Sequence, residues 1–240
     1  MHEMTSAGQP LPVVLLPGMM CDARLFAPQV AILSLACSVM VSPLTGADSI
    51  EKLAERVLAD APQRFVLGGL SMGGIVAMEI ARQAPERVAG LILMDTNPLP
   101  ESAARSATRE PQMIGARTGR LEEIIREEMK PNYLAPGPRR TEILDLVVDM
   151  AMALGAEVFV DQSRALQRRP DQQSTLRRLK CPALVLCGEH DTLCPLARHT
   201  LMDDLIPQSQ LRVISGAGHL PVLEQPDAVT SAIATFLSDL

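Results

Sequence analysis

The chain has 240 residues, of which 47% are hydrophobic and 21% charged, so it is long enough to bury a large core as one domain or one core with an insertion. Its net charge of −6 excludes the basic field that nucleic acid or an anionic membrane would need, and no apolar run reaches transmembrane length. Five cysteines without framework spacing, and a polar segment 1–9 with no signal-peptide core, predict a cytoplasmic protein with reduced thiols.

Short apolar segments alternate with helical ones in the first part of the chain. We predict strands at residues 11–16, 38–42, 64–68 and 89–94, and helices at 24–33, 48–58 and 74–82. Asp48 with Glu51 makes a capping pair for the second of these helices. Because the strands are apolar almost throughout and alternate with helices, they predict an α/β fold whose parallel sheet is covered on both faces.

The alternation stops at about residue 98 and resumes at about residue 181. Between them we expect no buried strand, only helices at 119–130, 141–155 and 157–169 and a fourth that ends at 176–180. We interpret Arg139-Arg140 and Arg168-Arg169 as solvated helix ends. Strands at 183–187 and 211–214 and helices at 196–205 and 226–240 then complete the sheet. The predicted organisation is a core of residues 1–97 and 181–240, with an insertion at residues 98–180.

The pentapeptide Gly69-Leu70-Ser71-Met72-Gly73 is a G-x-S-x-G motif between a predicted strand and a predicted helix. A strand that turns sharply into a helix at a serine is a nucleophile elbow, which exposes the hydroxyl above the sheet. Glycines at 69 and 73 remove Cβ atoms that would collide as the strand and the helix approach. A structural serine in a glycine-rich turn is the alternative, but the strand–turn–helix setting favours Ser71 as a nucleophile.

A serine nucleophile needs a base, and the chain has four histidines. His219 lies in a glycine-rich loop directly after the last strand. The carboxyl ends of parallel strands share one edge of a sheet, so this loop and the elbow should converge there. His2 lies in the polar first segment, His190 lies in a strand-end turn, and we place His199 on the surface of a helix. We therefore predict that His219 takes the proton of Ser71.

Two aspartates compete to orient this histidine. Asp191 follows the strand at 183–187, and Asp95 follows the strand at 89–94, so both lie at the same edge of the sheet. The chain order serine, Asp191, His219 is the order expected for a triad built on such an elbow. We favour Asp191 as the acid. Asp95 stays open as the alternative acid or as a turn cap.

A tetrahedral intermediate needs backbone N–H donors. Met72 follows the nucleophile directly and should supply one of them. The loop after the first strand should supply the other, and since Pro17 has no N–H, Met19 is the expected donor. Met19, Met20 and Met72 either line the acyl site or pack in the core, and the residues do not decide between the two.

A metal site is a competing interpretation of the segment around Asp191. Cys187 with His190, and Cys194 with His199, superficially offer four zinc ligands. However, Cys187 belongs to a predicted buried strand and His199 to a helix, and the spacing lacks the paired knuckles of structural zinc sites. We therefore expect neither a metal nor a cofactor.

Four segments together resemble the α/β-hydrolase superfamily. They are residues 15–19 (Leu-Leu-Pro-Gly-Met), 69–74 (Gly-Leu-Ser-Met-Gly-Gly), 188–191 (Gly-Glu-His-Asp) and 218–221 (Gly-His-Leu-Pro). The resemblance implies a serine hydrolase core whose insertion at 98–180 is a helical cap. Many relatives have histidine in place of Pro17, which puts the geometry of the oxyanion loop in doubt. Only ten residues precede the first strand, so the usual leading strands should be missing and the sheet reduced to about six parallel strands.

Within this superfamily, the chain looks most like small carboxylesterases, enol-lactone hydrolases and methyl-ester hydrolases. That resemblance implies a carboxylic-ester hydrolase with an acyl-Ser71 intermediate and a small-molecule substrate. A lyase, a perhydrolase or a carbon–carbon hydrolase with the same triad is one alternative, and a non-catalytic ligand receptor is another. A haloalkane dehalogenase is disfavoured, because those enzymes need a carboxylate where Ser71 stands. The natural substrate and the oligomeric state stay open.

The expected substrate is a small to medium, largely neutral or apolar ester or lactone. The insertion carries apolar side chains that include Met150 and Phe159, and the loop after the first strand adds Met20 and Phe26. We take these four as candidate substrate contacts. No cluster of basic residues is evident in the strand-end loops to clamp a carboxylate or phosphate. The flexible methionines predict loose acyl selectivity.

Overall fold

A computed structural model describes residues 10–129 and 133–240. The polar segment 1–9, including His2, and residues 130–132, at the end of the helix expected over 119–130, lie outside the described residues. Within the described residues, no helix is both long enough and apolar enough to cross a membrane.

Six strands form one parallel sheet, as the sequence predicts, and their order in the sheet is β2-β1-β3-β4-β5-β6. They are β1 (Val13–Leu16), β2 (Val39–Val41), β3 (Phe65–Leu70), β4 (Val88–Met94), β5 (Ala183–Gly188) and β6 (Ser209–Ile214). The strands β1, β3, β4 and β5 are buried along their whole length, because helices cover both faces of the sheet. β6 lies at an edge and alternates in exposure.

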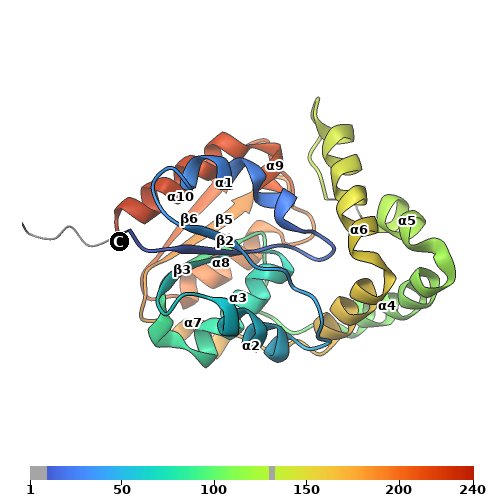
Figure 1. Cartoon of the computed structure of the whole chain (residues 1–240), viewed down its shortest axis with the longest axis horizontal. Helices are drawn as coiled ribbons and strands as arrows, with labels where there is room; N and C mark the ends of the chain where they lie inside the picture. Colours follow the sequence, from blue (N-terminus) through green and yellow to red (C-terminus); the bar gives the residue numbers. More distant parts are fainter. Residues whose placement is uncertain (1–9, 130–132) are drawn as a thin grey trace, which may run out of the picture.

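Helices cover the two faces of the sheet in two groups (Figure 1). On one face, α1 (Ala27–Leu33), which follows the short turn η1 (Ala23–Phe26), packs against α10 (Pro226–Ser238). On the other face lie α2 (Ile50–Asp60), α3 (Met72–Gln83) and α8 (Leu196–Leu205).

The first turn of α2 departs from the sequence-based interpretation. Its N-cap is Ser49, whose hydroxyl accepts a hydrogen bond from the Lys52 N–H at 3.3 Å. Asp48 therefore lies one residue outside the cap, and the expected pairing of Asp48 with Glu51 is wrong. Serine is as good an N-cap as aspartate, so the hydroxyl one residue later can take that place.

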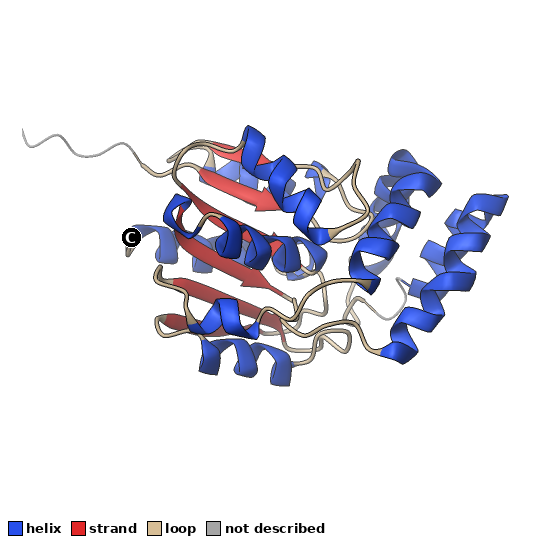
Figure 2. Cartoon of the chain, turned by 90° about the horizontal axis from the view of Figure 1, so that it is seen from below, coloured by secondary structure: helices blue, strands red, loops and turns tan. Residues whose placement is uncertain are grey.

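The described part of the segment between β4 and β5 contains helices and loops and no strand. Its helices are α4 (Ala103–Gly115), the short η3 (Ala116–Arg120), α5 (Leu121–Glu123) and η4 (Ile124–Met129), the long α6 (Arg140–Gln167) and α7 (Gln173–Arg177). Gly155 has a φ of 83° and breaks α6 where the sequence predicts a boundary between two helices. The helices α4, α5 and α6 stand together on one side of the molecule, toward which the strand arrows point (Figures 1 and 2). In contrast, α7 packs against α3 and α8.

The register of the sheet brings the chemically important residues to this edge. Leu70, the last residue of β3, pairs with Met94, the last residue of β4. Ser71 and Asp95 therefore begin adjacent loops. The loop after β5 carries Asp191, and the loop after β6 leads through His219 into α9 (Pro221–Glu224).

Candidate active site

Ser71 occupies a strained turn between β3 and α3. Its φ of 54° and ψ of −114° lie outside the regions that residues with side chains normally adopt. A Cβ atom on Gly69 would overlap the backbone of Gly73, and a Cβ atom on Gly73 would overlap the carbonyl oxygen of Leu16. The two glycines thus permit the close approach of β1, β3 and α3 that the sequence predicts for a nucleophile elbow.

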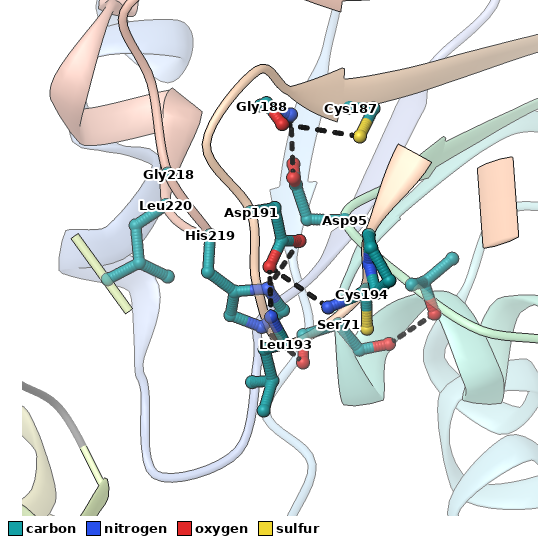
Figure 3. A network of polar contacts seen from close by, with 12 residues as sticks. Ser71, Asp95, Cys187, Gly188, Asp191, Leu193, Cys194, Gly218, His219 and Leu220 are labelled. Carbon is teal, nitrogen blue, oxygen red and sulfur yellow. Dashed lines mark hydrogen bonds and ion pairs between the residues drawn. The ribbon is translucent and has the colours of Figure 1, made fainter. Parts of the chain in front are cut away.

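The structure brings Ser71, His219 and Asp191 into one hydrogen-bonded chain (Figure 3). The Nε2 atom of His219 lies 2.9 Å from the Ser71 hydroxyl oxygen. The Nδ1 atom lies 2.8 Å from Oδ2 of Asp191, and neither the histidine nor the aspartate side chain is more than 1% exposed. The other carboxylate oxygen of Asp191 accepts the N–H groups of Leu193 and Cys194 at 2.8 and 2.9 Å.

These contacts set the charge of Asp191. Burial alone would raise its pKa, but the hydrogen bond and charge of His219, with the Cys194 N–H, outweigh burial and hold the pKa below its usual value. Asp191 is therefore a carboxylate at neutral pH. It can accept the Nδ1–H of His219, which leaves Nε2 free to accept the proton of Ser71.

Asp95 lies beside Asp191 rather than against the imidazole (Figure 3). Its Oδ1 atom accepts the N–H of Gly188 at 2.8 Å, and its Oδ2 atom is buried and receives no hydrogen bond from any described donor. Burial and the charge of Asp191 raise the pKa of Asp95 well above its usual range. Protonation would let Asp95 donate a hydrogen bond to Asp191, and this interaction lowers the pKa of Asp191. Asp95 thus supports the acid that contacts His219.

Glu224 holds the loop that carries His219, and the sequence analysis did not predict this function. Its carboxylate accepts three backbone N–H groups, those of Gly218 at 3.0 Å, Leu220 at 3.0 Å and Ala135 at 2.8 Å. Two of these donors flank His219 in sequence, and the third belongs to the segment that enters α6. The available signal was an acidic residue in the first turn of a helix directly after the histidine loop.

His199 is fully buried, so its predicted place on the surface is wrong. Its Nε2 atom accepts the N–H of Thr96 at 3.3 Å, which fixes the tautomer whose Nδ1–H faces the Pro195 carbonyl at 3.4 Å. Burial lowers the pKa of His199 to about 4. The hydroxyl of Thr96 in turn donates to the Ser71 carbonyl at 2.7 Å. His199 therefore supports the elbow indirectly, through Thr96. Its polar sequence neighbours do not reveal that this face of the helix is buried.

The four ligands considered for zinc lie in different surroundings. Cys187 and His199 belong to one buried group with Asp95, and Cys194 belongs to a second group with the triad pair. His190 is half exposed beside Glu189. The four residues therefore do not form one group of possible metal ligands within the described part of the chain.

The loop after β1, which we expect to supply an oxyanion donor, packs against the elbow. A Cβ atom on Gly18 would lie 3.6 Å from the Cβ atom of Ser71. Met20 has a φ of 56°, and its N–H donates to the buried side chain of Gln162 at 2.8 Å. Met72 is the first residue of α3, where backbone N–H groups have no acceptor within the helix.

A cavity of about 490 Å³ opens over Ser71. The loop after β1, the elbow, the end of β4, α4 and the residues around Tyr133 line it; they include Met19, Met72, Ile75, Thr96, Asn97, Thr108, Met129, Leu166 and Leu193. The ring of Tyr133 meets that of His219 edge to face at 5.1 Å, and its carbonyl accepts the His219 N–H.

The four side chains proposed from sequence as substrate contacts lie elsewhere. Met20, Phe26, Met150 and Phe159 are fully buried in the hydrophobic core and do not line the cavity. Their assignment to the pocket is therefore wrong for this cavity. Apolar character alone does not distinguish a side chain that fills the core from one that faces a ligand.

Charged side chains form part of the cavity wall, whereas the sequence analysis predicted a largely apolar pocket. Glu101 lies 2.8 Å from the Arg109 guanidinium, 3.7 Å from that of Arg169 and 3.9 Å from that of Arg105. Arg169 is not a solvated helix end, because its side chain is 10% exposed and donates to the Leu99 carbonyl at 2.9 Å. We call Glu101, Arg105, Arg109 and Arg169 the arginine cluster.

Comparison with curated proteins and solved structures identifies esterases as relatives. A pimeloyl-[acyl-carrier protein] methyl ester esterase of Yersinia pseudotuberculosis serotype O:1b (strain IP 31758) is 29% identical over 201 residues, which cover 81% of this chain and 77% of the relative. The enzyme of the same name from Klebsiella pneumoniae subsp. pneumoniae is 30% identical over 197 residues, covering 76% and 73% of the two chains.

Two solved structures extend the similarity to nearly the whole fold. A thermophilic esterase from Thermogutta terrifontis, determined with malate bound, is 33% identical with a TM-score of 0.87, covering 97% of this chain and 91% of its own. The enol-lactonase from Burkholderia xenovorans LB400 is 24% identical with a TM-score of 0.85, covering 96% and 92%, and supports the fold alone. The sequence model of the alpha/beta hydrolase family matches residues 13–232 of this chain. With its parallel sheet and its serine elbow, the chain belongs to the α/β hydrolase family.

Proposed function

We propose that the protein is a serine hydrolase that cleaves carboxylic esters through an acyl-Ser71 intermediate. One observation carries the proposal: Ser71 Oγ, the His219 imidazole and the Asp191 carboxylate form a continuous hydrogen-bonded chain at the base of a cavity. The names of the relatives, a methyl ester esterase and a thermophilic esterase, support the same reaction class.

In the first half of the reaction, His219 removes the proton of Ser71 as the hydroxyl attacks the ester carbonyl. Asp191 holds the Nδ1–H and stabilises the imidazolium that forms. The backbone N–H groups of Met72 and Met19 donate to the oxyanion of the tetrahedral intermediate. His219 then gives its proton to the departing alcohol, which leaves the acyl group on Ser71.

In the second half, water enters the cavity and His219 takes one of its protons. The resulting hydroxide attacks the acyl carbonyl, and the second tetrahedral intermediate collapses to a carboxylic acid. Ser71 recovers its proton from His219, so the enzyme returns to its starting state. The net reaction consumes one water for each ester bond and needs neither a metal nor a cofactor.

We further propose that residues 98–180 act as a cap whose body is α4, α5 and α6. These helices stand at the end of the strands, and α4 contributes directly to the cavity. The packing of α7 against α3 and α8 supports a boundary between cap and core ahead of α7. A cap in this position would exclude water from the reacting carbonyl.

Substitution of Ser71 by alanine tests the proposal. Hydrolysis of p-nitrophenyl acetate should fall on the order of a million-fold, which is the typical cost of losing a serine nucleophile. A fluorophosphonate probe should label the wild type and not the Ser71→Ala variant. Ser102 lines the same cavity, so Ser102→Ala is the matched control and should keep both labelling and turnover. Undiminished turnover in Ser71→Ala would overturn the assignment, and labelling without turnover of any ester would favour the receptor alternative.

A further inference from the structure

The arginine cluster carries more positive than negative charge. Three guanidinium groups surround the single carboxylate of Glu101. The remaining charged residue of the cavity wall, Glu128, is exposed and accepts a hydrogen bond from Gln112 at 3.0 Å. With Glu128 counted, the wall still has one uncompensated positive charge. A cavity with this balance favours a monoanionic group over a neutral one.

Burial makes this imbalance significant. The side chains of Arg109 and Arg169 are 8% and 10% exposed, and that of Glu101 is 1% exposed. Water compensates such cations poorly, so a second carboxylate would be bound more strongly here than at the protein surface. Arg105 is half exposed and lies at the outer side of the cluster.

The arginine cluster also lies next to the reaction centre. The Nη1 atom of Arg109 contacts the Met19 sulfur at 3.6 Å, and Met19 belongs to the proposed oxyanion loop. Sulfur is a weak acceptor, so this contact leaves the guanidinium able to hydrogen-bond a ligand in the cavity that it lines. Ser71 and all four members of the cluster line the same cavity. One small molecule can therefore reach both.

We propose that the arginine cluster is a subsite for a carboxylate of the substrate, so that the protein prefers esters that carry a free carboxylate over neutral esters. This inference rests on the proposed ester hydrolysis and names its substrate class. A planar carboxylate matches the forked guanidinium donors of Arg109 and Arg169. The proposal replaces our sequence-based expectation of a neutral or apolar substrate, which considered only the strand-end loops. The arginines come instead from α4 and from the segment after α6.

Monomethyl esters of linear dicarboxylic acids test the subsite against methyl esters of monocarboxylic acids of equal chain length. At the chain length that spans Ser71 and the arginine cluster, kcat/KM for the anionic ester should exceed that for the neutral ester by about tenfold to a hundredfold, as expected for hydrogen bonds to a charged group. In Arg109→Gln and Arg105→Gln this ratio should fall toward one, more strongly for the buried Arg109. Because the ratio is measured within each variant, it does not depend on how much of the variant folds.

Arg117→Gln is the matched control. Arg117 is another arginine of the helical insertion, half exposed and paired with Glu157, and it does not line the cavity. This variant should keep the wild-type ratio. A wild-type ratio of one or less at every chain length, with neutral esters still cleaved, would overturn the subsite and leave the proposed function standing.

Binding of free glutarate or adipate gives a readout that does not need turnover. Titration calorimetry should detect binding to the wild type and to Ser71→Ala, with at least about tenfold weaker binding to Arg109→Gln. Binding that is equal in all three proteins, or absent from Ser71→Ala, would contradict the subsite whether or not any ester is cleaved.

Discussion

Replacing Asp95 with asparagine should preserve most of the turnover, whereas the same substitution at Asp191 should abolish nearly all of it. Asparagine at position 95 keeps an oxygen for the Gly188 N–H, which lies 2.8 Å from Oδ1 of Asp95. Its NH₂ group can donate to Asp191 in place of the carboxyl proton. Asparagine is thus a close substitute for a neutral Asp95, and the acid beside His219 keeps its hydrogen bonds.

The magnitudes differ because the two aspartates carry different charges. The Asp191→Asn substitution should lower kcat about 10,000-fold, since an amide in place of the carboxylate imposes the wrong imidazole tautomer. The Asp95→Asn substitution should change kcat by less than about tenfold, because one hydrogen bond to Asp191 is exchanged for another of similar strength. Turnover of p-nitrophenyl acetate measures both. A dead Asp95→Asn variant with an active Asp191→Asn variant would mean that the acid belongs to β4 and not to β5.

Unfolding at several pH values tests the protonation of Asp95 directly. The pKa of Asp95 is about 4 in the unfolded chain and is raised in the folded chain. At pH values between these two pKa values, the folded state holds a proton that the unfolded state has lost. Stability due to this group is complete below about pH 4 and declines as pH rises, by at most about 1.4 kcal/mol per pH unit. Urea unfolding should therefore show that Asp95→Asn becomes more stable relative to the wild type as pH rises from about 5 toward neutral. A difference that does not change with pH would refute a protonated Asp95.

Three further substitutions and one control variant test the supporting contacts. The Glu224→Ala substitution should destabilise the fold by about 1–3 kcal/mol in urea unfolding, since three N–H groups lose their acceptor. It should also lower kcat while changing KM less, because the loop that carries His219 is held less firmly. The lowered pKa of His199 makes the wild type lose stability, up to about 3 kcal/mol, as pH falls from about 6.5 to about 4. The His199→Gln substitution should remove this part of the pH dependence of stability. Ser49→Ala should lower the unfolding free energy by about 1 kcal/mol, whereas Asp48→Ala should have almost no effect.

The fold of the core and the contacts that join Ser71, His219 and Asp191 are predictable from sequence because local patterns and the topology of the sheet determine them. A parallel sheet follows from apolar strands that alternate with helices, and such a sheet places the loops after β3, β5 and β6 at one edge. The elbow follows from Gly69 and Gly73, whose missing side chains allow an approach that no other residue permits. The contact between His219 and Ser71, which lie 148 residues apart in the sequence, then follows from topology rather than from any local pattern.

The buried environment of these residues was harder to predict. His199 sits between Arg198 and Thr200 and looks like a surface residue, but the face it presents is covered by the loop after β4. The same difficulty applies to Phe26 and Phe159, which are apolar in a way that suits a pocket or a core equally well. Such choices depend on which elements pack together, and periodicity within one element contains no information about its neighbours.

The charge of the cavity illustrates this limit most clearly, and it bears on substrate choice. Arg109 lies in α4 and Arg169 lies after α6, so only the folding of the helical insertion brings them to the same carboxylate. The triad comes from the ends of sheet strands, whereas the arginine cluster comes from the insertion and its borders. We therefore expect a change at Arg109 to alter which esters bind without disturbing the contacts among Ser71, His219 and Asp191. This separation is why the test of the reaction at Ser71 and the test of substrate charge at Arg109 can fail independently.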